Sequence, residues 1–148
     1  MDEKATVKET LKDILVKLDL EAKIEMSEKD GAIWAKLDTA EPGVLIGRHG
    51  RNLESLQVYV SQVVAKKLGV WVRLVLTVGD YRERREQQLI ELANSAAEQV
   101  MGSAQPVVLS ELTPAERRIV HLALADRPQL QTESTGEGRF RILTVKLK

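Results

Sequence analysis

Residues 45–50, Leu-Ile-Gly-Arg-His-Gly (LIGRHG), are the stretch that decides the fold of this 148-residue chain. Apolar residues at 44–46 predict a short helix before the two glycines, and residues 51–67 predict a second helix after them. A Gly-x-x-Gly loop between two helices can bind a phosphate, although the same residues also fit a plain helix–helix turn. The sequence on either side of the loop has to decide between these two interpretations.

The loop Gly47–Gly50 has the chemistry of a phosphate site. Glycine adopts positive φ and carries no side chain, so the backbone amides beside it can approach a phosphate closely. The following helix adds unpaired N-terminal amides and a dipole that favours an anion. Further donors come from Arg48, His49 and Arg51. No Gly-Lys-Ser/Thr follows the loop and no strand precedes it, so it fits neither a P-loop nor a dinucleotide fingerprint.

The elements around this loop predict one α+β unit that ends near Gly79. Asp30-Gly31 is a strong hairpin signal between two alternating apolar stretches. In chain order the pattern predicts a helix at 4–18, strands at 22–27 and 32–37, the two helices around the loop, and a strand at 70–78. The order is therefore α-β-β-α-α-β, and residues 1–79 are expected to form the first domain.

A second domain is expected over residues 80–148, and it starts with a helix whose basic beginning joins the two halves. Thr113, Pro114 and Glu116 give a clear helix start, because threonine can cap, proline suits the first helical position and glutamate completes a capping box. In chain order the pattern predicts a helix at 80–101, a strand at 107–109, the capped helix to about residue 125, and strands at 129–134 and 139–147. This is a small α/β domain with helices on a three-stranded sheet.

Arg117 and His121 lie four residues apart on the capped helix, so they share one face of it, one turn apart. Near a phosphodiester, a guanidinium can fork onto the phosphate oxygens and an imidazole can donate one more hydrogen bond. A packing histidine beside Leu122 and Leu124 is the other interpretation, and the spacing alone leaves it open.

Both units resemble known nucleic-acid-binding domains. The LIGRHG loop within the α-β-β-α-α-β order resembles a type II (prokaryotic) KH domain. The run Glu116–His121, the tripeptide Asp-Arg-Pro at 126–128 and the stretch Glu-Ser-Thr-Gly-Glu-Gly at 133–138 resemble the Arg-x-x-x-His domain, R-3-H for short. The resemblance implies RNA contacts by Gly47, Arg48, His49, Gly50 and Arg51 in the first domain, and by Arg117 and His121, supported by Arg118, Arg127, Arg139 and Arg141, in the second.

In KH domains the glycine loop clamps about four single-stranded nucleotides, and their bases lie in a groove between the flanking helices and one sheet edge. Val44 or Ile46 are expected to line that groove here. The five aromatic residues are scattered, so each is expected in the core or at an edge: Trp34, Tyr59, Trp71, Tyr81 and Phe140. Base readout is therefore expected from hydrogen bonds in the groove rather than from stacking.

A KH unit followed directly by an R-3-H unit is similar to the bacterial Jag family, also called KhpB or EloR. Many members carry an additional N-terminal Jag-N domain, which is not expected here because the chain begins with the KH helix. The resemblance implies a cytoplasmic protein that binds single-stranded RNA, with single-stranded DNA as a second candidate, and a link to cell-envelope growth. It also implies a second, small KH protein as a partner. The alternative is a protein-interaction adaptor that binds RNA weakly or not at all.

Charge and composition agree with a binding protein. The net charge is zero, but residues 47–85 hold 8 basic and 3 acidic groups, a local net of +5, which suits nucleic acid or mere solubility. The absence of cysteine excludes disulfides and thiol catalysis, and two histidines in different units argue against a metal cluster, a cofactor or an enzyme. No apolar run reaches the roughly 18 residues that span a bilayer, so no membrane insertion is expected.

Overall fold

A two-residue turn at Asp30 and Gly31 organises the N-terminal sheet. Both residues have positive φ, 53° and 74°, as the tight hairpin turns that match strand twist require. The turn joins β1 (Lys23–Lys29) to β2 (Ala32–Asp38), which pair antiparallel over their whole length. The hairpin that the Asp-Gly signal predicts is therefore confirmed.

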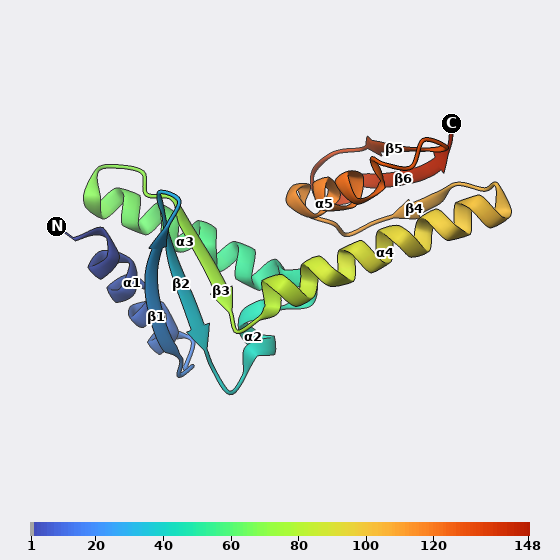
Figure 1. Ribbon diagram of the computed structural model, residues 1–148. Helices are drawn as coiled ribbons and strands as arrows, with labels where there is room; N and C mark the ends of the chain where they lie inside the picture. The colour runs from blue at the N-terminus through green and yellow to red at the C-terminus, as the bar shows by residue number, and fades with distance from the viewer. Residues whose placement is uncertain (1) are drawn as a thin grey trace. The chain divides into compact units, whose positions relative to one another are not determined.

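The structure is a computed structural model that describes residues 2–148. The chain divides into two units, one ending at Arg82 and the other running from Glu83 to Lys148. In the first unit, the remaining elements are α1 (Glu3–Lys17), α2 (Pro42–Ile46), a 3-10 turn η1 (Arg48–Gly50), α3 (Arg51–Leu68) and β3 (Leu74–Val78) (Figure 1). The predicted α-β-β-α-α-β order is confirmed, and the strands lie in the order β1-β2-β3 with β2 and β3 parallel.

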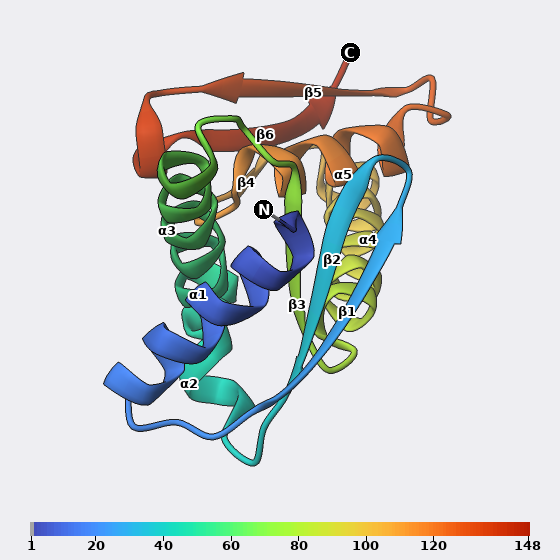
Figure 2. The same cartoon turned by 90° about the vertical axis from the view of Figure 1, so that its left-hand side faces the viewer.

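One face of this sheet carries the core of the unit. Helices α1 and α3 lie on the same side of the three strands (Figure 2). Alternate residues of β2 are buried beneath them, whereas Lys36 and Asp38 between those residues are exposed. The largest fully buried side chains come from both layers: Val7, Leu11, Leu37, Val60, Val64, Leu76 and Val78. The glycine loop is held between α2 and α3, which both pack on this core.

The third strand is shorter than the predicted 70–78. It starts at Leu74, whose partner in β2 is Ile33, and the Ile33 amide donates to the carbonyl of Arg73 at 2.9 Å. Residues before Arg73 have no strand to pair with, because β2 itself starts only at Ala32, directly after the hairpin turn. Val72 still packs in the core, but Val70 is exposed, although a strand over 70–78 would place it on the same face as Val72.

The second unit combines two helices with a small antiparallel sheet, so the α+β prediction is confirmed for both units. Helix α4 (Tyr81–Ser103) enters it from the first unit and is followed by β4 (Val107–Leu109), α5 (Pro114–Leu124), β5 (Leu130–Thr135), the 3-10 turn η2 (Gly138–Phe140) and β6 (Ile142–Leu147). The strand order is β4-β6-β5. Apolar residues of α4, α5 and all three strands form one core that includes Ala93, Val100, Val120, Leu143 and Val145.

The start of α5 has the predicted capping box. The Thr113 hydroxyl accepts the Glu116 amide at 3.2 Å, and the Glu116 carboxylate accepts the Thr113 amide at 3.0 Å. The same carboxylate accepts a 2.6 Å hydrogen bond from Nε of Arg85 on α4. Both side chains of this ion pair are nearly buried, at 17 % exposure for Arg85 and 10 % for Glu116. The pair ties α4 to α5.

The last predicted strand, 139–147, is interrupted at its beginning. Residues Gly138–Phe140 form a 3-10 turn, and β6 starts only at Ile142. Gly136 and Gly138 have φ of 97° and 57°, and the Phe140 amide donates back to the Glu137 carbonyl at 3.2 Å. The chain therefore finishes a tight loop before it can pair with β5.

Candidate nucleic-acid interface

The glycine loop is braced from one side by Asn52. Its Nδ2 donates to the carbonyl of Val44 at 3.0 Å and so ties the first turn of α3 back to α2. A Cβ built on Gly47 would lie 2.5 Å from Cγ of Asn52, and the φ of Gly47 is positive, at 69°. Only glycine fits at this position, because the brace occupies the space that a side chain needs.

On its other side the loop packs against Tyr81. His49 and Gly50 both have left-handed backbone conformations, with φ of 56° and 76°. A Cβ at Gly50 would lie 2.8 Å from the hydroxyl oxygen of Tyr81. Helix α3 begins at Arg51 with no side chain capping its N-terminus. A left-handed turn that leads into an uncapped helix is the arrangement in which backbone amides and the helix dipole can bind an anion.

The two basic residues of the loop differ in exposure. Arg48 is exposed, whereas His49 and, after the loop, Arg51 are half-buried. The two apolar residues expected to line a groove also differ in exposure. Val44 is 54 % exposed, but Ile46 is buried in the core. The exposed side chains here are therefore the Arg48 guanidinium, from the loop, and Val44, from the helix before it.

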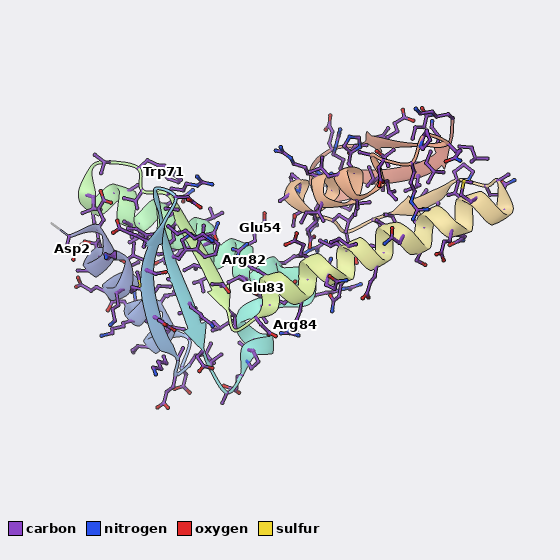
Figure 3. All side chains as sticks on the ribbon, viewed as in Figure 1. Asp2, Glu54, Trp71, Arg82, Glu83 and Arg84 are labelled. Atoms are coloured by element: carbon purple, nitrogen blue, oxygen red, sulfur yellow. The ribbon has the colours of Figure 1, made fainter. Side chains whose placement is uncertain are left out.

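The outer edge of β3 at Leu76 is occupied by side chains of the same unit. The Leu76 amide donates to Oε1 of Gln57 at 2.9 Å, and the Leu76 carbonyl accepts from Nε of Arg82 at 2.7 Å. Arg82 also donates from Nη2 to the same Gln57 oxygen at 2.9 Å, so the three groups close a ring. Figure 3 shows Arg82 on the first turn of α4. A nucleobase cannot hydrogen-bond to the Leu76 backbone while this ring is closed.

In the second unit, His121 and Arg117 lie on α5 as expected, and each has a defined partner. Nδ1 of His121 forms a hydrogen bond with the Thr132 hydroxyl on β5, and the imidazole as a whole is exposed. Nη1 of Arg117 donates to the Leu112 carbonyl at 2.7 Å. His121 is thus oriented by the sheet while it stays accessible, and it is not a core histidine.

Arg141 is brought to the same face of β5. Its Nε donates to the Ser134 hydroxyl at 2.8 Å and its Nη2 to the Ser134 carbonyl at 3.1 Å. Ser134 follows Thr132 by two residues, so both point to one face of the strand. Because His121 contacts Thr132, the structure places the His121 imidazole and the Arg141 guanidinium on neighbouring positions of that face.

The other arginines of the expected site are used differently. Nη2 of Arg127 donates to Oδ1 of Asn94 on α4 at 3.2 Å, which secures the turn after α5. Arg118 and Arg139 are exposed. Arg139 holds its guanidinium 5.2 Å from the ring centre of Phe140. The side chains that hold these basic residues, Asn94, Thr132 and Ser134, were not found from the sequence. No motif distinguishes them from other polar surface residues.

One surface carboxylate of this unit has a shifted pKa. A 2.7 Å hydrogen bond from Lys146 and the charge of that lysine hold the pKa of Glu133 below its ordinary value. Glu133 is thereby kept ionised on the face of β5 opposite Thr132. Among residues 2–148, no three histidine, aspartate or glutamate side chains are grouped so that they could hold a metal ion.

Three aromatic residues are more exposed than the sequence predicts, and the first of them, Tyr59 on α3, is 46 % exposed. Trp71, in the loop between α3 and β3 (Figure 3), is 69 % exposed, and Phe140 is 78 % exposed. A core or edge position was expected for all three, and for Trp71 and Phe140 the prediction is wrong because each sits in a loop that precedes a strand instead of within the strand.

Fold and geometry together define the class of protein. A glycine loop between two helices of an α-β-β-α-α-β unit is a type II KH domain, and an Arg-x-x-x-His helix docked on a three-stranded sheet is an R-3-H domain. Comparison with known families agrees: residues 4–76 match the family described as KhpA/KhpB, KH domain, and residues 87–147 match the R-3-H domain.

Two curated relatives match most of this chain. The chain is 34 % identical over 155 residues to the RNA-binding protein KhpB of Clostridium symbiosum, covering 98 % of this chain and 70 % of the relative. It is 38 % identical over 112 residues to the RNA-binding protein KhpB of Lactiplantibacillus plantarum, covering 75 % of this chain and 34 % of the relative. A shorter match, 36 % over 52 residues, is to small ribosomal subunit protein uS3 of Lachnoclostridium phytofermentans. The chain belongs to the KhpB family, which is the Jag family of the sequence resemblance.

Within residues 2–148, no helix is both long and apolar enough to cross a membrane.

Proposed function

We propose that this protein binds single-stranded RNA and holds its phosphates at two places, the Gly47–Gly50 loop and the Arg117–His121 helix. The observation that carries the proposal is the left-handed glycine loop that leads into the uncapped start of α3. Relatives named RNA-binding proteins support RNA as the ligand. The protein acts by binding and not by catalysis, and cytoplasmic RNA is its target.

In the first unit, the loop amides and Arg48 bind the phosphates, while Arg51 and His49 flank them. In the second unit, Arg117 on α5 acts together with His121 and Arg141, whose side chains share one face of β5. Each site makes few contacts, so each alone is weak. Two weak sites on one chain reach a useful affinity when a single RNA engages both, because the second contact is then intramolecular.

The test is fluorescence-anisotropy titration of labelled single-stranded RNA, single-stranded DNA and duplex RNA at two salt concentrations. The Arg48→Asp/His49→Asp variant and the Arg117→Ala variant should each bind single-stranded RNA more weakly than wild type. Each lost phosphate contact should also reduce the slope of log affinity against log salt by about 0.7.

The matched control replaces two exposed lysines of α1, in Lys12→Asp/Lys17→Asp. It changes the net charge at least as much as the loop variant does, but on a helix that does not carry the loop, so it should weaken binding less. If the loop variant and this control lose affinity equally, long-range charge alone explains binding and the loop is not a clamp. If wild type shows no salt-sensitive binding to RNA, the proposal fails.

A second candidate function is pairing with another protein, and exposed apolar residues of the first unit favour it. Val58, Tyr59, Val70 and Trp71 are between 46 % and 69 % exposed. The matching family description covers both KhpA and KhpB, which suggests a second small KH protein as the partner. In that case Trp71→Ser should abolish complex formation in light scattering, and the Arg48→Asp/His49→Asp variant should retain it. The link to cell-envelope growth that the resemblance implies belongs to the RNA-binding function.

A further inference from the structure

Phe140 is an aromatic side chain that the core does not use. It stands on the loop between β5 and β6 with 78 % of its surface exposed. A single exposed apolar residue is ordinary on a protein surface. The surroundings of Phe140 are unusual, because both its backbone and its ring have defined contacts.

The backbone at Phe140 is fixed by the neighbouring arginine. The three hydrogen bonds of Arg141 to Ser134 and to the Gly136 carbonyl, the last at 2.7 Å, close the loop from inside. The amides of Phe140 and Arg141 complete the 3-10 turn at 3.2 Å each. The ring is therefore carried on a rigid loop, and little conformational entropy is lost when a ligand covers it.

The ring is also paired with a cation. The Arg139 guanidinium lies 5.2 Å from the ring centre, within the range of a cation–π contact. A planar guanidinium over one side of a phenyl ring that is 78 % exposed offers positive charge together with flat apolar surface. Unpaired nucleotides fit this chemistry, because a base stacks on aromatic or guanidinium planes while its phosphate is anionic.

The loop belongs to the hairpin that carries the second phosphate site. Thr132, the partner of His121, and Ser134, the partner of Arg141, both lie on β5 just before it. In the first unit the β3 edge at Leu76 is closed by side chains, so hydrogen-bonded base readout is blocked at that point. A base contact beside the second site would add to the phosphate contacts proposed for both units.

We propose that Phe140, together with Arg139, is a stacking platform for an unpaired base of the bound RNA. This inference rests on the proposed RNA binding and adds to it a second kind of contact, with the base and not the phosphate. The platform is indifferent to base identity, because every base has a π face.

The experiment compares two labelled decamers, oligo-adenylate and a fully abasic ribose-phosphate of the same charge. Phe140→Ala and Phe140→Leu should each weaken oligo-adenylate binding by about 5- to 150-fold, the range for loss of one base–aromatic stack. Phe140→Trp should keep wild-type affinity or exceed it. With the abasic decamer all four proteins should bind alike, because no base is present to stack.

Val108→Ala is the matched control, since Val108 is an exposed apolar residue of β4 in the same unit, and it should bind both decamers like wild type. Circular dichroism of each variant checks that the unit is folded. If wild type binds oligo-adenylate and Phe140→Ala or Phe140→Leu binds it equally well, the platform is refuted while RNA binding stands. If Phe140→Ala weakens the abasic decamer as much as oligo-adenylate, Phe140 acts through the loop and stacking is refuted. If wild type binds neither, the proposed function itself fails.

Discussion

The ion pair between Arg85 and Glu116 gives a prediction about stability that is independent of any ligand. Arg85 belongs to the basic stretch that suggested nucleic-acid binding, yet its guanidinium is turned onto the Glu116 carboxylate at 2.6 Å. Arg85→Ala would leave that carboxylate, which is 10 % exposed, without its cationic partner and hydrogen-bonded to the Thr113 amide. The expected effect is therefore a loss of folding stability.

The size of the loss follows from how deeply the pair is buried. Breaking a fully buried pair costs about 3–5 kcal/mol, whereas an exposed pair is worth about 0–1 kcal/mol. Since both partners keep a small exposed fraction, we expect a loss of about 2 kcal/mol. Glu116→Gln keeps an oxygen for the Thr113 amide and removes the charge, so Arg85→Ala should cost less in that background than in wild type.

Urea unfolding can assign the effect to the correct unit, because both tryptophans, Trp34 and Trp71, lie before residue 83. Tryptophan fluorescence thus reports the first unit, and far-ultraviolet circular dichroism reports both. With a urea slope of about 1 kcal/mol per molar for so small a unit, Arg85→Ala should lower the midpoint of the second unit by about 2 M. The fluorescence midpoint should stay in place.

Arg118→Ala is the control, since it removes an exposed arginine from α5, and it should change stability by less than about 0.5 kcal/mol. If Arg85→Ala unfolds like wild type, the pair contributes nothing and the reasoning from burial is refuted. Equal costs of Arg85→Ala in the wild-type and Glu116→Gln backgrounds would show that an unpaired carboxylate is not the cause.

Three further outcomes can be measured directly. Gly50→Ala should weaken RNA binding about tenfold in anisotropy titrations, because alanine strains the left-handed loop by about 1–2 kcal/mol, while Gly43→Ala, with negative φ and open space around it, should not. Gly31→Ala should lower the stability of the first unit by about 1 kcal/mol in fluorescence-detected unfolding, through backbone strain alone, and an unchanged midpoint would contradict this. Lys146→Ala should raise the pKa of Glu133 toward its ordinary value in a carboxyl NMR titration; the depressed pKa means that this carboxylate stabilises the fold above its ordinary pKa and ceases to do so as the pH falls through the lowered one.

Local sequence signals predicted most of the fold. The hairpin at Asp30-Gly31 and the capping box at Thr113 depend on residues at most three apart in the sequence. Their geometry is therefore determined by the local sequence alone. The glycine loop is local in the same sense. The start of β3 is not, because whether residues 70–73 pair depends on where a strand 40 residues earlier begins. Alternation of apolar residues cannot carry that information.

The roles of individual side chains at the candidate site were less predictable. Arg117 and His121 were found from their helical spacing, but Thr132, which orients the imidazole, lies on another element and has no pattern of its own. Asn52 and Tyr81, which pack against the glycine loop, also have no sequence pattern that predicts this role. These contacts are set by tertiary packing, and a motif identifies only the residue that it names.

The basic stretch at 47–85 shows why the number of basic residues exceeds the number that can contact phosphates. If all eight of its basic residues met phosphates of a single strand, the slope of log affinity against log salt would be about −5.6. Arg82 instead closes the edge of β3 and Arg85 pairs with Glu116, so both are held by the fold. We expect Arg48→Gln/Arg51→Gln to make the slope shallower by about 1.4, as two phosphate contacts imply, and Arg82→Met to leave it unchanged. If Arg82→Met changed the slope by half as much as the double variant, this arginine would also bind phosphate. Closing the edge of β3 would then not be its main role.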